Sequence, residues 1–132
     1  MAAPHGKTVV CTEGSIILTS FHGAFNADGI KEYIEKVKAE IARFAGQPFK
    51  MLVDDTDIEG GTPDAYEELN RYNEWLNTQP IVAKAFVVKQ SVVKDIVLSR
   101  TPALKSQQIA FFHEKAEAID WLNGLEDTHP GD

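Results

Sequence analysis

A single cysteine, Cys11, is present among the 132 residues, which excludes an internal disulfide and a metal site built from several cysteines. Cys11 falls in a strand-like run, and we expect it to be a small buried hydrophobic residue. Long apolar runs are also missing, since none approaches the roughly 20 residues that a membrane-spanning helix needs. The N-terminal MAAPHGKTVV has no signal-peptide core. We therefore expect a cytoplasmic protein without a membrane span.

Positive charge is scarce as well, because 13 Lys and Arg residues face 20 Asp and Glu residues, for a net charge of −7. Contacts to phosphate groups require clustered Lys and Arg. These residues are scattered here, so nucleic acid is not an expected partner. The four histidines, His5, His22, His113 and His129, lack the spacing of a zinc site. No G-x-S-x-G motif presents a nucleophilic serine, and we expect no metal and no cofactor.

Apolar residues switch between strand-like and helix-like spacing along the chain. Strands are expected at 7–13, 15–21, 49–53, 81–89 and 107–112, and helices at 30–44, 65–76, 91–99 and 118–125. The order ββαβαβαβα predicts an α/β fold with a five-stranded, mostly parallel sheet and an antiparallel edge strand. The run at 81–89 is apolar on both faces and is expected at the centre of the sheet. We expect a single domain over residues 1–125 and a disordered tail at 126–132.

The stretch KMLVDDTDIEGGTPDAYEEL, residues 50–69, joins an expected strand to an expected helix. Asp54, Asp55 and Asp57 are residue types that can hold Mg²⁺, but alternation along a strand points neighbouring side chains to opposite sides. We expect these carboxylates to solvate the end of the strand and to cap a turn. Thr62 is a good helix N-cap, and Pro63 suits the first helical position, where its missing N–H costs nothing.

This stretch, the closing IAFFHEKAEAIDWLNGL and the order of the elements together resemble the SpoIIAA-like family of small bacterial proteins. That family is related to STAS domains and, more distantly, to CRAL-TRIO lipid-transfer domains. Its packing motif corresponds here to Phe112, Ala118, Trp121 and Leu122. The resemblance covers residues 15–125 and implies a SpoIIAA-like (STAS-like) β/α superhelix, often found as a homodimer. It implies no particular reaction, because the shared motifs are packing motifs.

The resemblance also offers a second role for Thr62. Anti-sigma-factor antagonists carry a phosphorylatable Ser or Thr where a strand turns into a helix, in an Asp-Ser-Ser-Gly-like turn. Thr62 stands at about that place, but its neighbours Gly61 and Pro63 depart from the pattern. Thr62 is therefore a candidate phosphoacceptor, and we favour its role as a helix cap.

Ligands of open parallel α/β sheets bind beyond the carboxyl ends of the strands. This rule defines a candidate ligand site, the strand-end rim, consisting of His22, Asp55, Asp57, Lys89, Ser91 and His113. The alternative location is the second helix, where Tyr66 and Trp75 are expected to share one exposed surface. Because exposed aromatic residues are enriched at protein interfaces, we favour an interface at Tyr66 and Trp75.

Three hypotheses about function stay open. The lack of catalytic motifs favours a non-catalytic, homodimeric binding or regulatory module, which can also take a protein partner. A carrier or sensor of a small apolar ligand or lipid would instead require an apolar pocket. An unrecognised hydrolase or phosphotransfer enzyme would require groups with perturbed pKa values that converge at the strand-end rim.

Overall fold

The computed structural model describes residues 3–126. The elements are, in chain order, β1 (Lys7–Glu13), β2 (Ile16–Phe25), α1 (Ala27–Ala42), β3 (Phe49–Gly61), α2 (Pro63–Leu76), β4 (Ile81–Val87), α3 (Ser91–Arg100), the 3-10 helix η1 (Pro102–Ser106), β5 (Ile109–Phe112) and α4 (Lys115–Asn123). The predicted order ββαβαβαβα is confirmed, with η1 as an additional short element. Residues 127–132 of the expected tail lie outside the described residues.

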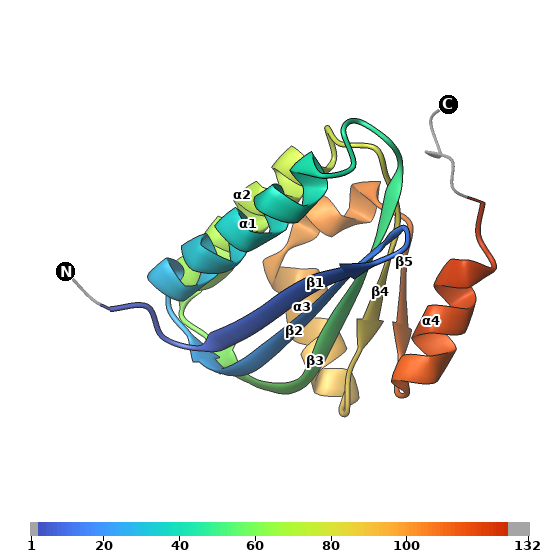
Figure 1. Ribbon diagram of the computed structural model, residues 1–132. Helices are drawn as coiled ribbons and strands as arrows, with labels where there is room; N and C mark the ends of the chain where they lie inside the picture. Colours follow the sequence, from blue (N-terminus) through green and yellow to red (C-terminus); the bar gives the residue numbers. More distant parts are fainter. Residues whose placement is uncertain (1–2, 127–132) are drawn as a thin grey trace.

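The strands follow one another in the sheet in the order in which they occur along the chain (Figure 1). β1 pairs antiparallel with β2, and each later pair of neighbours is parallel. This arrangement confirms the predicted mixed sheet with an antiparallel edge strand. The β1–β2 hairpin turns at Gly14, whose φ of 59° lies in the left-handed region that glycine adopts at low cost.

Helices cover both faces of the sheet, but unequally. α1 and α2 lie side by side (Figure 1) and, with η1 and the end of α3, enclose the larger apolar cluster, which includes Tyr33, Val37 and Leu76. α4 covers the opposite face around β4, where Ala118 and Leu122 are fully buried. None of the helices within residues 3–126 is long and apolar enough to cross a membrane.

Cys11 is exposed, so the expectation of a buried cysteine is wrong. Side chains of β1 alternate between the two faces of the sheet, and Thr8 is buried whereas Val9 is 48% exposed. Cys11 points to the same face as Val9. This face is open at β1 because α4 packs on β4 and β5, at the far end of the sheet.

β3 is 13 residues long and continues through the acidic stretch, whereas the sequence predicted a strand at 49–53. The strand continues because β2 pairs with it from Lys50 to Gly61, so the aspartates belong to a ladder and not to a turn. β3 is therefore the middle strand of the five, and β4, which we expected at the centre, lies next to it. All seven residues of β4 are buried, as expected for a strand between two parallel neighbours.

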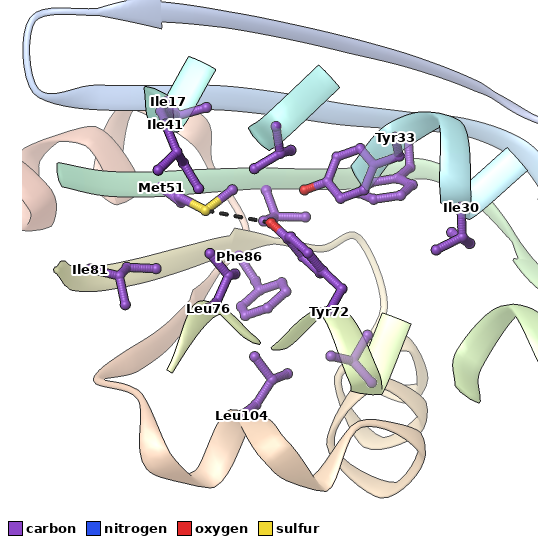
Figure 2. Packing of buried hydrophobic residues seen from close by; sticks show 14 of the residues in the cluster. Ile17, Ile30, Tyr33, Ile41, Met51, Tyr72, Leu76, Ile81, Phe86 and Leu104 are labelled. Carbon is purple, nitrogen blue, oxygen red and sulfur yellow. Dashed lines mark hydrogen bonds between the residues drawn. The ribbon is translucent and has the colours of Figure 1, made fainter. Parts of the chain in front are cut away.

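Aliphatic and aromatic side chains, among them Tyr33, Tyr72 and Phe86, fill the layer between the sheet and the α1 and α2 helices (Figure 2). The Tyr72 hydroxyl lies 3.8 Å from Met51 Sδ, and the ring of Tyr72 meets that of Tyr33 edge-on with centroids 5.7 Å apart. Phe86 of β4 stacks on Phe111 with centroids 4.8 Å apart. Burial of one large apolar side chain stabilises a fold by roughly 1.5–3 kcal/mol, so this layer fixes α1 and α2 on the sheet.

Candidate functional site

A cavity lies within this aromatic layer, between the sheet and the α1 and α2 helices. Its volume is about 40 Å³, and its wall is mostly apolar. Asp55 from β3, Lys84 from β4 and Asn73 from α2 also line it, and each of these polar residues is 5% exposed or less. We call it the Asp55–Lys84 cavity.

Asp55 is the buried acidic residue of the cavity. Its carboxylate makes no hydrogen bond and no ion pair with any residue of the described range 3–126. Burial raises the pKa of Asp55 to about 7, and Asp54 adds to this rise while Lys84 opposes it. A buried carboxylate without a partner lowers stability, so Asp55 marks a position where a binding partner would be favourable.

Lys84 is the second ionisable group of the cavity. Its Nζ donates a hydrogen bond to Asn73 Oδ1 at 2.6 Å, and Gln107 Nε2 donates to the same oxygen at 3.2 Å. Lys84 Nζ also lies 5.5 Å from the ring centroid of Tyr72. Burial lowers the pKa of Lys84 to about 7, and the charge of Asp55 opposes this fall. One hydrogen bond from Lys84 leaves further N–H donors on its ammonium group.

Two tyrosines of the cavity wall stay neutral. Burial raises the pKa of Tyr33 to about 12, and burial together with Tyr33 raises the pKa of Tyr72 well above its ordinary value. The Tyr33 hydroxyl donates to Thr19 Oγ1 at 3.5 Å. At neutral pH these residues therefore supply hydroxyl groups and ring faces, whereas Asp55 and Lys84 can change charge.

A β-bulge in β3 keeps Asp57 off the face on which Asp55 lies. Ser20 of β2 pairs with Asp54 of β3. His22, two residues further along β2, pairs with Asp57, which is three residues further along β3. β3 therefore holds one extra residue in this interval. Asp55 continues the alternation of Met51 and Val53 and faces the helices α1 and α2. The extra residue shifts the alternation after it, so Asp57 shares the opposite face with His22.

The expectation that the aspartates solvate a strand end is wrong for Asp55, which is buried in the cavity. Asp54 Oδ1 accepts from the N–H of Thr56 at 3.0 Å and from its hydroxyl at 2.6 Å. The three aspartates therefore have three separate surroundings. Within residues 3–126, no group of three or more His, Cys, Asp or Glu side chains is placed to hold a metal.

The residues of the strand-end rim do not form one site. His22 Nδ1 lies 3.1 Å from Asp57 Oδ2, and His22 Nε2 lies 3.0 Å from Ser20 Oγ, on the face opposite to the cavity. These contacts form a local, solvent-facing pair.

The remaining rim residues lie beyond β4 and β5. His113 Nδ1 donates to the Val88 carbonyl oxygen at 3.1 Å, Lys89 is exposed, and Ser91 begins α3. Of the six rim residues, Asp55 lines the cavity and the other five are absent from its described wall.

Thr62 is the N-cap of α2. Its hydroxyl oxygen accepts from the N–H of Ala65 at 3.3 Å, and the hydroxyl donates to Asp64 Oδ1. The N–H of Thr62 in turn donates to the Phe25 carbonyl oxygen at 2.9 Å. The side chain is exposed, but a phosphate at Thr62 would displace the cap and lie against the Asp64 carboxylate.

Tyr66 and Trp75 occupy different places, so the expectation that they share one surface is wrong. Tyr66 lines the Asp55–Lys84 cavity, whereas Trp75 lines a groove of about 320 Å³ between α1 and α2. Trp75 stacks on Tyr72 with centroids 6.5 Å apart, and Lys38 Nζ lies 4.9 Å from its ring centroid. Nine residues make two and a half helical turns, which puts the two side chains on opposite sides of α2.

Sequence reasoning missed two residues of the cavity, Lys84 and Asn73. The signal for Lys84 was a charged residue in the middle of IVAKAFVV, a run otherwise apolar, because a buried lysine requires an acceptor nearby. The signal for Asn73 was weaker. It lies one position from the apolar stripe of α2, and only the packing of α2 on β4 brings it to Lys84.

Both the sequence and the fold of the chain have known counterparts. The family model described as SpoIIAA-like matches residues 16–123. The fold is similar to that of an uncharacterised protein of the DUF3478 family with a SpoIIAA-like fold from Shewanella loihica, with a TM-score of 0.71 and 16% identity over 92% of this chain and 98% of that chain. No curated protein matches the sequence.

Two further solved structures share the fold at lower similarity. One is an anti-sigma factor antagonist from Mycobacterium paratuberculosis, with a TM-score of 0.64 and 14% identity over 93% of this chain and 99% of that chain. The other is the anti-sigma factor antagonist SpoIIAA in its unphosphorylated form, with a TM-score of 0.56 and 10% identity over 93% of this chain and 100% of that chain. At these identities the likeness shows the fold.

Because Thr62 caps α2, we expect the protein to lose stability when the Thr62 hydroxyl is removed. Thr62→Ala is expected to lower the free energy of unfolding by about 1 kcal/mol, because the N–H of Ala65 loses its acceptor. Urea unfolding followed by circular dichroism measures this change. Thr62→Ser keeps the oxygen and is the matched control. A Thr62→Ala variant as stable as the wild type would contradict a stabilising role for this contact.

Asp55 and Lys84 together predict an unusual dependence of stability on pH. The pKa of Asp55 rises from 3.8 to about 7 on folding, so its contribution to stability is lost as pH rises from about 4 to 7. The pKa of Lys84 falls from 10.5 to about 7, so its contribution is lost as pH falls over that range. The pair therefore contributes a minimum of stability near neutral pH.

Asp55→Asn removes the acidic side of this minimum. We expect the variant to gain stability relative to the wild type as pH rises from about 4 to 7, and to keep a constant advantage above about 7. Urea unfolding at several pH values measures the difference. Asp57→Asn, on the opposite face, is the control. A difference between Asp55→Asn and wild type that does not change with pH would mean that Asp55 titrates normally.

Proposed function

The chain belongs to the SpoIIAA-like family, and we propose that it is a cytoplasmic, non-catalytic binding module that senses a small ligand in the Asp55–Lys84 cavity. Its role is regulatory, because occupancy of the cavity alters how the start of α2 meets a partner protein. The observation that carries the proposal is the buried Asp55 carboxylate, which faces the cavity and has no partner within the described part of the chain.

An unpartnered buried carboxylate is costly for a protein that only has to fold. Nearly all buried polar groups in native structures have a hydrogen-bond partner. Replacing buried charged residues by apolar ones of similar size often stabilises a protein. An apolar side chain at position 55 would thus favour folding, and departures of this kind concentrate at functional sites. Asp55 is therefore better explained by a ligand than by stability.

The position of the cavity supports a regulatory output. Ala65 and Tyr66, in the first turns of α2, line the cavity, and Thr62 caps the same end of the helix. Pro63 and Asp64 of this turn are exposed. A ligand that pushes on Ala65 or Tyr66 would therefore move a surface that a partner protein can read. One similar structure is an anti-sigma factor antagonist, which favours a protein as the partner.

The arrangement supports binding better than catalysis. Asp55 and Lys84 do not make the direct hydrogen bond that joins a nucleophile to its general base. The volume of about 40 Å³ leaves room for roughly three water-sized groups, at about 10–15 Å³ each. A small ligand fits this space, whereas a substrate together with an attacking water would crowd it.

A panel of small alcohols, amines, carboxylic acids and hydrocarbons tests whether the cavity binds ligands. At least one class is expected to raise the melting temperature of the wild type, because a ligand of the folded state stabilises it. Ala65→Val adds volume at a buried position of the cavity wall and is expected to reduce the shift while circular dichroism shows the fold retained. Absence of a shift with every compound would refute the proposal.

A second proposal concerns self-association through the groove between α1 and α2. Besides Trp75 and other residues, the groove is lined by charges of both signs, namely Lys31, Lys38, Arg71, Glu35 and Glu68. In a two-fold dimer the same patch meets a copy of itself, so a patch with both signs can be complementary to its own copy. This observation favours a homodimer with Trp75 near its centre.

Trp75→Glu is expected to shift the protein toward monomer in sedimentation equilibrium. Because Trp75 also packs against the core, Lys38→Glu serves as a second variant, which reverses a charge in the groove and leaves the core untouched. Circular dichroism of both variants checks the fold. A wild type that sediments as a monomer across micromolar concentrations would refute the dimer.

A further inference from the structure

The two charged groups of the cavity also limit the chemistry of its ligand. Building on the ligand-binding function proposed above, we infer that the ligand is a short-chain carboxylic acid whose carboxyl group lies between Asp55 and Lys84. The inference depends on the unused hydrogen-bonding capacity of both side chains, on the charge of the cavity and on its volume.

The unused hydrogen-bonding capacity of Asp55 and Lys84 favours a ligand head group with two oxygens. The Lys84 ammonium has three donors, and one of them is taken by Asn73 Oδ1 at 2.6 Å. Asp55 and Lys84 both line the cavity and make no direct ion pair in the described structure, so a ligand in the cavity can contact both. One oxygen of a ligand carboxyl accepts from Lys84, and the other shares a proton with the Asp55 carboxyl.

Charge favours an acid over the other small head groups. A ligand carboxylate, the Asp55 carboxylate, one shared proton and the Lys84 ammonium sum to zero, which suits an apolar cavity. An amine would bring a second positive charge next to Lys84. A doubly charged phosphate would leave a net negative charge beside Asp55. An alcohol is neutral, but its single oxygen meets fewer of the free donors and acceptors.

The volume limits the alkyl part of the acid. Room for roughly three water-sized groups, in a cavity of about 40 Å³, corresponds to an acid of one or two carbons, since formic acid has three non-hydrogen atoms and acetic acid has four. Val53, Phe86 and Leu104 line the cavity and are buried apolar residues, so they can accept the alkyl chain. Longer acids would have to push α2 from the sheet.

Binding of an acid should be linked to protons. The bound state requires a protonated Lys84 and one proton between the two carboxyl groups, and burial has moved the pKa values of Asp55 and Lys84 to about 7. Near pH 6 both groups already hold their protons, whereas near pH 8 binding must take them up. The affinity is therefore expected to fall at least about tenfold from pH 6 to pH 8.

The other ionisable groups around Asp55 do not supply this proton. They are Asp54, which raises the pKa of Asp55, and Tyr33 and Tyr66, whose own pKa values are raised above 10.0. Tyr72 lies next to Lys84, and its pKa is raised as well. The charge of Arg100 partly opposes the rise in the pKa of Tyr66. The tyrosines stay protonated at pH 6–8, so Asp55 and Lys84 are the groups that respond.

Isothermal titration calorimetry with acetate, propionate, butyrate and hexanoate tests the inference. Propanol, which is neutral, and propylamine, which is positively charged, are the control ligands with a different head group. Measurements at pH 6 and pH 8, in buffers of different ionisation enthalpy, give the number of protons taken up. We expect acetate to bind more tightly than propanol or propylamine at pH 6, with proton uptake near zero at pH 6 and at least about one proton at pH 8.

Three variants separate this role from a structural one. Lys84→Met is expected to weaken binding of the acid at least about tenfold at pH 6, because it removes the cation. Asp55→Asn keeps a donor for the ligand and is expected to bind with about one proton less taken up at pH 8. Asp57→Asn, outside the cavity, is expected to match the wild type in affinity and in proton uptake.

Two results would overturn the inference. One is binding of propanol or propylamine that equals or exceeds binding of the acids, which rejects the acid and leaves the ligand-binding function in place. The other is acid binding whose affinity and proton uptake are the same in wild type and Asp55→Asn at both pH values. If neither these compounds nor any member of the wider panel binds, the proposed function itself fails.

Discussion

The hydrogen bond from Lys84 to Asn73 is the contact on which the cavity depends. A buried ammonium group without an acceptor is too costly to keep in an apolar layer, and Asn73 Oδ1 supplies that acceptor at 2.6 Å. The same oxygen also accepts from Gln107, so one atom of α2 is tied to β4 and to the segment before β5. Because these ties fix α2 over the sheet, the space beside them keeps its shape.

The aromatic rings around this contact explain why the space is not filled by collapse. Phe21 and Tyr33 lie with ring centroids 4.5 Å apart, and Tyr33 meets Tyr72 edge-on. Rigid rings pack in a few preferred geometries, and their hydroxyl groups need polar neighbours. Rings held in this way leave a small void whose polar side is formed by Asp55 and Lys84. The cavity lowers the free energy of unfolding, and a ligand that fills it would recover part of that loss as binding free energy.

Local patterns predicted the fold well, because each element has its own apolar period and its own end signals. The N-cap Thr62 and the order of strands and helices follow from such signals. The site followed less well. Alternation from Val53 already places Asp55 on the core face, but the face of Asp57 depends on how β2 pairs with β3, two strands separated by a helix. Only the pairing reveals the bulge. The separation of Tyr66 from Trp75 was different, because the helical repeat alone places residues nine apart on opposite sides.

The bulge in β3 is a point where the strand can lose a residue without losing its pairing. Between the pairs Ser20–Asp54 and His22–Asp57, β3 is one residue longer than β2. Deletion of Thr56 would remove the bulge and leave both pairs, and the faces of their side chains, as they are. A one-residue deletion in the regular part of β3, between Phe49 and Asp54, has no bulge to absorb it and would turn the side chains on one side of it to the other face. For relatives of this chain, a one-residue gap at the bulge is thus compatible with the same cavity, whereas the same gap earlier in β3 changes which side chains line it.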